Sequence, residues 1–441
     1  MLRKIKNFPQ IDGDLGWFET TSNRFEPIGE RLKKDIKVDI VIIGGGFSGI
    51  SAAARLSQNH PDLKIALVEA LRIGEGTSGR NAGFLIDLPH NLDTAVPDLQ
   101  RDKKIYELNS FGINLLQEAV EEYGIECSWQ KAGKYMAAHE TSNIKGLDTF
   151  EARLKPCGFA FERLKGLELE KRLGSSYYQE AIYTSGCVLA NPAALIRGYA
   201  KILENKVCIF EQSPIISIQY GSPHILHTQG GSVEAPIVLL ALDSHLEEFG
   251  VIAHRQVPVF TYASLTEPLT PQELETHFKG ISPYGLTSAH PAGSTLRLTP
   301  EGRIFIRNVL DFIPDMKSNP HQLQKVYQCH RNSFEARFPA LKYKRFDFTW
   351  GGMICVTLNR QAIFEKLENG VYVIGGSNGV GVVKGTYLGY YIAELISGKS
   401  SENLDFILKN NRAGMMPPDP FRSVGAKIRL WYEQRNAAGD I

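Results

Sequence analysis

The sequence predicts a mixed α/β protein built around a strand–helix–strand unit near its N-terminus. Residues 38–43 form a short apolar run that ends in glycines, which is typical of a buried strand. A helix rich in small residues is expected over 48–58, and a second buried strand over 64–69. Strand-like alternation recurs through the middle of the chain, and a late apolar run enters another glycine cluster at 375–381.

Length and composition set the class of protein. The chain has 441 residues, 43% of them hydrophobic, which is enough for two or three domains. With 49 Lys+Arg against 48 Asp+Glu, it does not resemble a general nucleic-acid binder. Its six cysteines lack Cys-x-x-Cys spacing and its histidines lack ligand spacing, so no metal site is predicted. Without an apolar segment near the roughly 20 residues of a membrane span, a soluble cytoplasmic protein is expected.

The other elements follow from periodicity. Residues 1–35 are interpreted as an arm anchored by Trp17 and Phe18. Strands are expected over 207–210, 215–220, 232–240, 257–265, 295–298, 303–309 and 371–374. Helices are expected over 102–124, 192–204, 321–337 and 384–395. A last segment, 426–435, is amphipathic and basic, and it either packs on the body of the protein or touches a membrane surface.

The first glycine cluster has the spacing Gly44-x-Gly46-x-x-Gly49 between a strand and a helix. In that context the first glycine makes a tight turn, the second admits a pyrophosphate, and the third lets helix and strand pack closely. The helix N-terminus offers N–H groups to the phosphates. Glu69 ends the second strand, where an acid accepts from ribose hydroxyls. A dinucleotide site is predicted; the alternative is a purely structural glycine turn.

Two further stretches favour FAD over NAD. Residues 72–83 are dense in glycine and hydrogen-bonding side chains, a composition that suits close wrapping around a flat ring and its diphosphate. The second cluster, 375–381, follows another strand and opens another helix, but its spacing differs and only about 60 residues follow it. A complete NAD domain does not fit there.

Several motifs resemble the FAD-dependent D-amino-acid oxidase superfamily, which includes glycine oxidase and sarcosine oxidase. The resemblance is strongest to the branch that contains gamma-glutamylputrescine oxidoreductase. It is carried by Gly76-Thr-Ser-Gly-Arg-Asn-Ala-Gly83, Gly186-Cys-Val-Leu-Ala-Asn-Pro192, Thr266-Glu-Pro-Leu269, Leu296-Arg-Leu-Thr-Pro-Glu-Gly-Arg303, Trp350-Gly-Gly, Asn359-Arg360 and Gly376-Ser-Asn-Gly-Val-Gly381. The match covers nearly the whole chain.

The resemblance implies a Rossmann-type, glutathione-reductase-like FAD-binding domain assembled from separated segments, plus an α+β substrate domain with a large mixed sheet. We assign 36–98, 182–252 and 350–441 to the first, and 99–181 and 253–349 to the second. The FAD, expected to be non-covalent, is assigned to Gly44, Gly46, Phe47, Ser48, Gly49, Glu69, Ala70, Arg72, Thr77, Ser78, Arg80, Asn81, Ala82, Gly83, Ile215, Gly376, Asn378, Gly379, Val380 and Gly381.

Two stretches depart from the family pattern. Where the family has Ser-Gly-His-Gly in the last loop, this chain has Asn378-Gly-Val-Gly381. Where the family has Ala-Thr-Gly-Ala after a strand, this chain has Ala241-Leu-Asp-Ser244. Both stretches are expected at the cofactor. A cysteinyl link through Cys355 is the less favoured alternative to non-covalent FAD, because the residues around it do not match.

The implied activity is oxidation of an amine or amino acid. The C–H next to nitrogen gives a hydride to flavin N5, and the resulting imine hydrolyses. Oxygen is the expected acceptor of the electrons, with hydrogen peroxide as product, while the oligomeric state stays open. Because the cofactor carries the difficult step, the protein orients and desolvates the substrate, and no catalytic triad is required.

Candidate catalytic or substrate-binding residues are Arg297, Arg307, Lys384, Tyr262 and Trp350. An arginine facing a pocket binds a carboxylate in bidentate fashion; the alternative for both arginines is a solvated strand face or a structural ion pair. Lys384 either lies near the flavin ring or is a solvated lysine of a first helical turn. The two aromatic residues either wall the pocket or belong to the core. Arg303 is assigned to structure.

Two other functions compete with this one. The leading interpretation is a catalytic oxidoreductase. The alternative is an FAD-binding subunit or scaffold with little amine turnover of its own, which is suggested by the departures at Val380 and Asp243. A nicotinamide-dependent dehydrogenase is the third reading, and it leaves residues 76–83 without a task.

Overall fold

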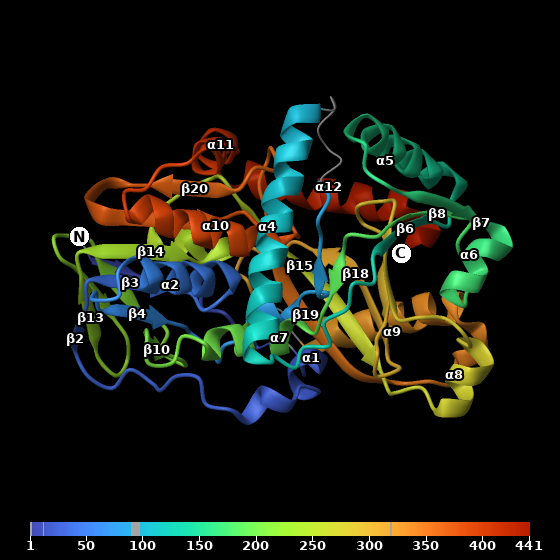
Figure 1. The fold of residues 1–441 in the computed structure, drawn as a ribbon, viewed down its shortest axis with the longest axis horizontal. Coiled ribbons are helices and arrows are strands. Elements are labelled where there is room, and N and C mark those ends of the chain that lie inside the picture. Colours follow the sequence, from blue (N-terminus) through green and yellow to red (C-terminus); the bar gives the residue numbers. More distant parts are fainter. Residues whose placement is uncertain (1, 12, 90–97, 318–319) are drawn as a thin grey trace.

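The computed structural model describes residues 2–11, 13–89, 98–317 and 320–441, which fold around two large sheets (Figure 1). The six-stranded sheet has the order β10 (Cys208–Phe210), β4 (Ile65–Val68), β3 (Ile40–Ile43), β14 (Ile237–Ala241), β21 (Val371–Gly375) and β20 (Ile363–Lys366). Its neighbours are parallel except for β20, which runs antiparallel to β21. Helices α2 (Phe47–Asn59) and α10 (Gly381–Ile396) cover one face of it.

Side-chain alternation explains the layers on the two faces of this sheet. Ile40 and Ile42 pack toward the helices, whereas Val41 and Ile43 pack toward the opposite layer. A strand buried on both faces reads as a continuous apolar run, which is why 38–43 shows no polar alternation. The opposite layer is a five-stranded sheet of β1 (Leu2–Lys4), β11 (Ser217–Gln219), β12 (His224–His227), β13 (Ser232–Ala235) and β2 (Ile36–Lys37).

The eight-stranded sheet is the frame of the second half of the molecule. Its order is β19 (Phe346–Val356), β15 (Val257–Thr266), β18 (Ile304–Asp311), β17 (Thr295–Leu298), β16 (Tyr284–Ser288), β6 (Lys134–Ala138), β8 (Glu180–Thr184) and β7 (Glu162–Lys165). Only β16 and β6 pair in parallel. The predicted fold class, a Rossmann-type domain plus a domain with a large mixed sheet, is confirmed.

The remaining helices surround these sheets or connect them. They are α1 (Gly16–Glu19), α3 (Thr77–Arg80), α4 (Leu99–Tyr123), α5 (Ile144–Cys157), α6 (Gly166–Leu173), α7 (Pro192–Lys201), α8 (Pro271–His277), α9 (Pro320–Arg337), α11 (Glu402–Asn410) and α12 (Phe421–Ala437). Strands β5 (Phe84–Leu85) and β9 (Val188–Leu189) form a separate pair. Helix α4 stands between the two halves of the molecule (Figure 1).

Some expected elements differ from the structure. The strand expected over 232–240 is two strands, β13 and β14, which belong to different sheets. They separate at Pro236, which has no backbone N–H to donate to a ladder. The expected domain limits at 182 and 350 fall inside β8 and β19. Each of these strands lies as a whole in the eight-stranded sheet, so neither limit coincides with the end of an element. Residues 90–97 of the expected segment 36–98 are outside the described residues.

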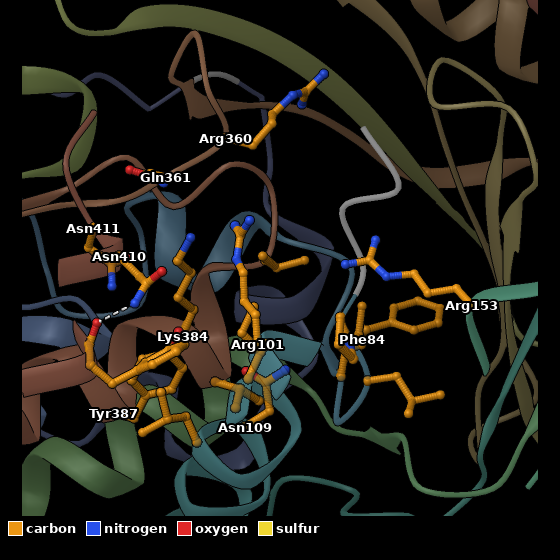
Figure 2. A pocket seen from close by; sticks show the side chains of 18 residues that line it. Phe84, Arg101, Asn109, Arg153, Arg360, Gln361, Lys384, Tyr387, Asn410 and Asn411 are labelled. Carbon is orange, nitrogen blue, oxygen red and sulfur yellow. Dashed lines mark hydrogen bonds between the residues drawn. The ribbon is translucent and has the colours of Figure 1, made fainter. Parts of the chain in front are cut away.

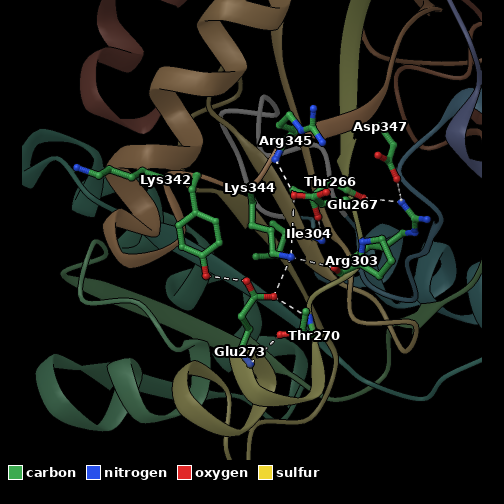
Figure 3. A network of polar contacts seen from close by, with 12 residues as sticks. Thr266, Glu267, Thr270, Glu273, Arg303, Ile304, Lys342, Lys344, Arg345 and Asp347 are labelled. Carbon is green, nitrogen blue, oxygen red and sulfur yellow. Dashed lines mark hydrogen bonds and ion pairs between the residues drawn. The ribbon is translucent and has the colours of Figure 1, made fainter.

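Arg303, assigned to structure from the sequence, lies in a polar network at the end of β18 (Figure 3). Its Nη1 donates to the Thr266 carbonyl at 2.6 Å and forms an ion pair with Asp347 at 2.7 Å. Nearby, the Lys344 ammonium lies 2.8 Å from a Glu273 carboxylate oxygen and donates to the Pro268 carbonyl. The network links α8 to strands β15, β18 and β19.

Candidate active site

The first glycine loop is a tight backbone cradle between β3 and α2. Gly44 has φ +106°, and a Cβ added there would lie 2.4 Å from the Ala241 carbonyl oxygen. A Cβ on Gly49 would lie 1.9 Å from the Gly44 carbonyl oxygen. Distances this short exclude any side chain at either position unless the backbone moves. Both glycines are therefore required by the turn and by close packing of helix on strand.

The N-terminus of α2 opens toward Ser78 of α3. A Cβ on Gly46 would lie 2.7 Å from Ser78 Oγ, and the Phe47 N–H donates to that oxygen at 3.2 Å. Gly46 is the N-cap and has no side chain to satisfy the first-turn N–H groups. The remaining N–H groups of the first turn and the positive end of the helix dipole are suited to bind phosphate. The donor set and the space left by Gly46 fit a dinucleotide diphosphate.

The predicted ribose acid lies beside the same loop. The Glu69 carboxylate accepts hydrogen bonds from the Gly45 and Leu71 N–H groups at 2.7 and 2.9 Å. Burial raises the pKa of this carboxyl, although the N–H donors oppose that shift. These bonds fix its position and leave lone pairs for a ribose. Ala70 follows it directly, and Ile215 is a buried core residue next to the neighbouring strand β11.

The Arg72 side chain contacts the N-terminal arm. Its guanidinium lies 4.8 Å from the centre of the Phe18 ring and donates to the Arg24 carbonyl. Trp17 and Phe18 are 3% and 4% exposed, so the arm is anchored at the two predicted residues.

The backbone of the stretch from Thr77 to Gly83 accepts hydrogen bonds from side chains of elements that are distant in the sequence. Trp17 Nε1 donates to the Asn81 carbonyl at 2.9 Å, and Trp350 Nε1 donates to the Arg80 carbonyl at 3.1 Å. Arg297 donates to the Ala82 carbonyl at 2.8 Å.

Side chains within the stretch also fix its shape. The Asn81 amide bridges the Ser78 carbonyl and the Gly83 N–H, and the Arg80 guanidinium donates to the Gly351 carbonyl at 2.8 Å. Thr77 is exposed at the start of α3. Arg297 and Trp350 therefore support the predicted cofactor segment from the second domain.

The second glycine loop connects β21 to α10. Gly376, Asn378 and Gly379 have φ of +68°, +55° and +80°. Asn378 stabilises its own conformation, because its Oδ1 accepts from the Thr357 N–H at 2.9 Å and its Nδ2 donates to the Gly376 carbonyl. Val380 is the N-cap of α10 and Gly381 its first residue.

Asp243 explains the departure in the neighbouring loop. It has φ +46° at the position where the family pattern has glycine. Its carboxylate accepts from the Ser377 N–H and from Ser377 Oγ, both at 3.0 Å. Burial raises the pKa of this carboxyl. The acid thus joins the loop after β14 to the second glycine loop.

The two glycine loops approach each other because α10 packs closely on α2. A Cβ on Gly389 would lie 2.2 Å from the Ser48 carbonyl oxygen, and one on Gly385 would lie 2.9 Å from Ser48 Oγ. Small residues on α10 therefore bring the strand ends and helix N-termini of residues 44–49 and 376–381 to one side of the sheet.

A cavity of about 90 Å³ lies where α10 faces α4 (Figure 2). Lys384 and Arg101 both point into it, and Arg360 lies above them. Among the described residues, neither Lys384 nor Arg101 has a hydrogen bond or ion pair from its cationic group, and Arg101 Nε is buried. The described lining residues include no carboxylate side chain. The described lining of the cavity therefore carries positive charge, and the Asp243 carboxylate acts on Lys384 from outside that lining.

The charge state of Lys384 is sensitive to these surroundings. Only 9% of the residue is exposed, which contradicts the interpretation as a solvated lysine. Burial lowers the pKa of its ammonium to about 8; Asp243 opposes that shift and Arg101 adds to it. Arg153, also in the lining, is paired with Asp102. An incoming anion would relieve the repulsion between Lys384 and Arg101.

The other candidates from the sequence do not line this cavity. Tyr262 and Trp350 have no exposed surface and belong to the core. Arg307 donates to Thr295 Oγ1 at 2.8 Å and Thr261 Oγ1 at 3.3 Å, and burial lowers its pKa to about 10. Arg297 is 1% exposed, and burial likewise lowers its pKa to about 10. Of the site residues predicted from the sequence, only Lys384 and Val380 line the cavity.

Arg101 was missed from the sequence, because the expected helix began at 102 and left this residue outside it. It lies in the first turn of α4, where a positive charge opposes the helix dipole. Arg360 also lines the cavity, and in the structure its backbone has a left-handed φ of +57°.

These features define a dinucleotide-dependent oxidoreductase fold with a glycine cradle on a parallel sheet. The chain belongs to the FAD-dependent oxidoreductase family, whose sequence pattern matches residues 39–395. It is 25% identical over 438 residues to gamma-glutamylputrescine oxidoreductase of Escherichia coli (strain K12), covering 96% of each chain. It is 26% identical over 371 residues to the probable oxidoreductase OrdL of Haemophilus influenzae, covering 82% of this chain and 83% of that one.

Solved structures agree on the fold. Glycine oxidase from Geobacillus kaustophilus superimposes with a TM-score of 0.69 at 17% identity, covering 83% of this chain and 96% of that one. The predicted family and its cofactor, FAD, are confirmed.

Proposed function

We propose that this protein oxidises the carbon–nitrogen bond of an amine or amino acid that also carries an acidic group. The observation that carries the proposal is the cavity with Lys384 and Arg101, two cations without a partner among the described residues, beside the second glycine loop. FAD, when bound, supplies the acceptor for the hydride that leaves the carbon next to nitrogen. The product is an imine, which hydrolyses in water.

The residues divide the work between cofactor and substrate. Gly46, Ser78 and the first turn of α2 hold the diphosphate, and Glu69 holds the ribose. Lys384 and Arg101 bind the acidic group and so fix the orientation of the amine. Charge-assisted contacts of this kind are stronger than neutral ones. By fixing the acidic group, they hold the donor carbon at the short distance from the acceptor that hydride transfer needs.

Non-covalent attachment of the cofactor is supported by the state of Cys355. Its thiol is fully buried and donates to Gln256 Oε1 at 3.3 Å. Burial raises the pKa of the thiol well above its usual value, which removes the nucleophilic thiolate. We therefore expect FAD to be released by acid or heat denaturation, and flavin that stays with the denatured chain would contradict this.

The test of the function is an anaerobic titration of the holoprotein with amines, D- and L-amino acids and N-methyl amino acids. Bleaching of the flavin absorption by at least one acidic amine is expected. Air is then admitted. Reoxidation with hydrogen peroxide formation identifies an oxidase, which is the activity we propose. Reoxidation only by an added electron acceptor identifies a dehydrogenase.

A second candidate function is an FAD-binding subunit or scaffold with little turnover of its own. Val380 at the start of α10 and Asp243 at a left-handed backbone position favour it, because both replace residues of the family pattern next to the cofactor. It expects bound FAD that no amine bleaches, and Val380→His would then introduce bleaching. Rapid bleaching of the unaltered protein would reject it.

A further inference from the structure

Helix α12 exposes an apolar stripe to solvent. Phe421, Val424, Ile428, Trp431 and Tyr432 are 70%, 53%, 60%, 60% and 53% exposed. At 100° per residue they share one stripe along the outer face of the helix. Large apolar side chains gathered in this way mark an interaction surface, whereas single exposed ones need no explanation.

The inner face of α12 is polar and fixed to the body of the protein. The Gln434 amide exchanges two hydrogen bonds with the Leu310 backbone, at 2.9 and 3.0 Å. Arg422 forms an ion pair with Glu247 at 2.6 Å, and Glu433 lies 3.5 Å from His290. After the helix, buried Asp440 accepts from the His139 N–H. A surface helix normally buries its apolar side; here specific polar contacts hold that side outward.

The charges around the stripe are positive. Lys427 and Arg429 are exposed on its two flanks, and Arg435 lies within it, 5.5 Å from the centre of the Trp431 ring. Glu433, the acid of this helix, is 17% exposed at its side chain and is paired with Arg429. Aromatic residues with flanking cations suit the interface of an anionic bilayer, where long cationic side chains reach the headgroups.

We infer that α12 docks this protein onto a membrane surface that contains anionic lipids. The apolar stripe enters the headgroup region, and Lys427 and Arg435 contact lipid phosphates. Among the described residues no helix is long and apolar enough to cross a bilayer. The helix lies beyond residue 395, where the match to the family's sequence pattern ends.

Vesicle sedimentation of the holoprotein tests this. We expect binding to phosphatidylglycerol vesicles at least about tenfold tighter than to phosphatidylcholine vesicles, with loss at high salt. Phe421→Ser/Ile428→Ser/Trp431→Ser should lower binding at least tenfold, and Lys427→Gln/Arg435→Gln should remove the preference for anionic lipid. Leu167→Ser and Lys171→Gln, at exposed sites on α6, are the matched controls and should bind normally.

Tryptophan fluorescence provides a second readout that needs no variant. Of the four tryptophans, Trp17 and Trp350 are buried, Trp129 is partly buried and Trp431 is exposed. Binding should therefore shift the emission of Trp431 to shorter wavelength and protect it from acrylamide. The inference is overturned by absence of binding to phosphatidylglycerol vesicles, or by binding that the triple variant leaves unchanged. A dimer that the triple variant dissociates, without lipid binding, would also overturn it and assign the stripe to self-association.

Discussion

The two glycine loops of the FAD domain are built under different constraints. In the first, Gly44 and Gly49 are required by backbone atoms of the same strand–turn–helix unit and of the adjacent strand β14, within 2.4 Å of any added Cβ. In the second, a Cβ on Gly379 would meet nothing within 4 Å, and Asn378 adopts a left-handed conformation through its own side-chain bonds. The first loop is thus determined by close backbone packing within its own unit and against β14, whereas the second depends on side-chain hydrogen bonds, from Ser377 to Asp243 and from the Thr357 N–H to Asn378.

This difference predicts that the first loop is the more sensitive to a single methyl group. Gly49→Ala should weaken FAD binding at least about tenfold, equivalent to about 1.4 kcal/mol, because its Cβ would overlap the Gly44 carbonyl oxygen. The flavin-to-protein ratio after dialysis measures the loss. Gly425→Ala, in helix α12, is the control, since no atom lies within 4 Å of its added Cβ. Equal flavin retention in both variants would contradict the assignment of the first glycine loop as the backbone cradle that binds FAD.

The cavity beside the second loop should instead be sensitive to charge, because Lys384 of α10 and Arg101 of α4 both point into it. Lys384→Met or Arg101→Met should raise KM for an acidic amine on the order of 30- to 100-fold, because each removes one cation from a partly buried anion site. The KM for a neutral amine of the same length should change little. Steady-state kinetics with both substrates check this, and a parallel loss for the two substrates would indicate a structural role.

The same site should titrate in an accessible range. With the pKa of Lys384 lowered to about 8, the ammonium is charged below that pH and binds the carboxylate; the contribution is lost as pH rises through about 8. We expect kcat/KM for an acidic amine to fall above that pH, and Lys384→Arg to move the fall upward. A fall of the same size for a neutral amine would assign the titration to another group.

The smallest effect is expected at Asp243. Asp243→Ala removes the acceptor of two hydrogen bonds from Ser377 and leaves a β-carbon at φ +46°, so unfolding should become about 1–2 kcal/mol easier. Asp243→Gly should recover part of this because glycine adopts that φ readily. Both substitutions should lower the pH at which kcat/KM for the acidic amine falls, because the Asp243 carboxylate raises the pKa of Lys384. Thermal unfolding and the pH profile measure the two effects.

The sequence predicted the elements whose signal is local. The strand–helix–strand unit, Glu69 and the start of α10 are recognisable because glycine spacing and apolar runs are written within a few residues. The cavity was not predictable in the same way, because Arg101, Lys384 and Arg360 come from three elements far apart in the sequence. Likewise, the roles of Arg297 and Trp350 in holding the stretch 77–83 depend on strand pairing across the eight-stranded sheet.

The central claim is that this flavoprotein selects amines by an acidic group bound at Lys384 and Arg101. The most direct test is rapid anaerobic mixing of the holoprotein with two amines of equal length, one ending in a carboxylate and the other in a methyl group. The account predicts fast, saturable bleaching of the flavin by the acidic amine and much slower bleaching by its neutral counterpart. Equal rates for the two, or a flavin that neither reduces, would contradict it.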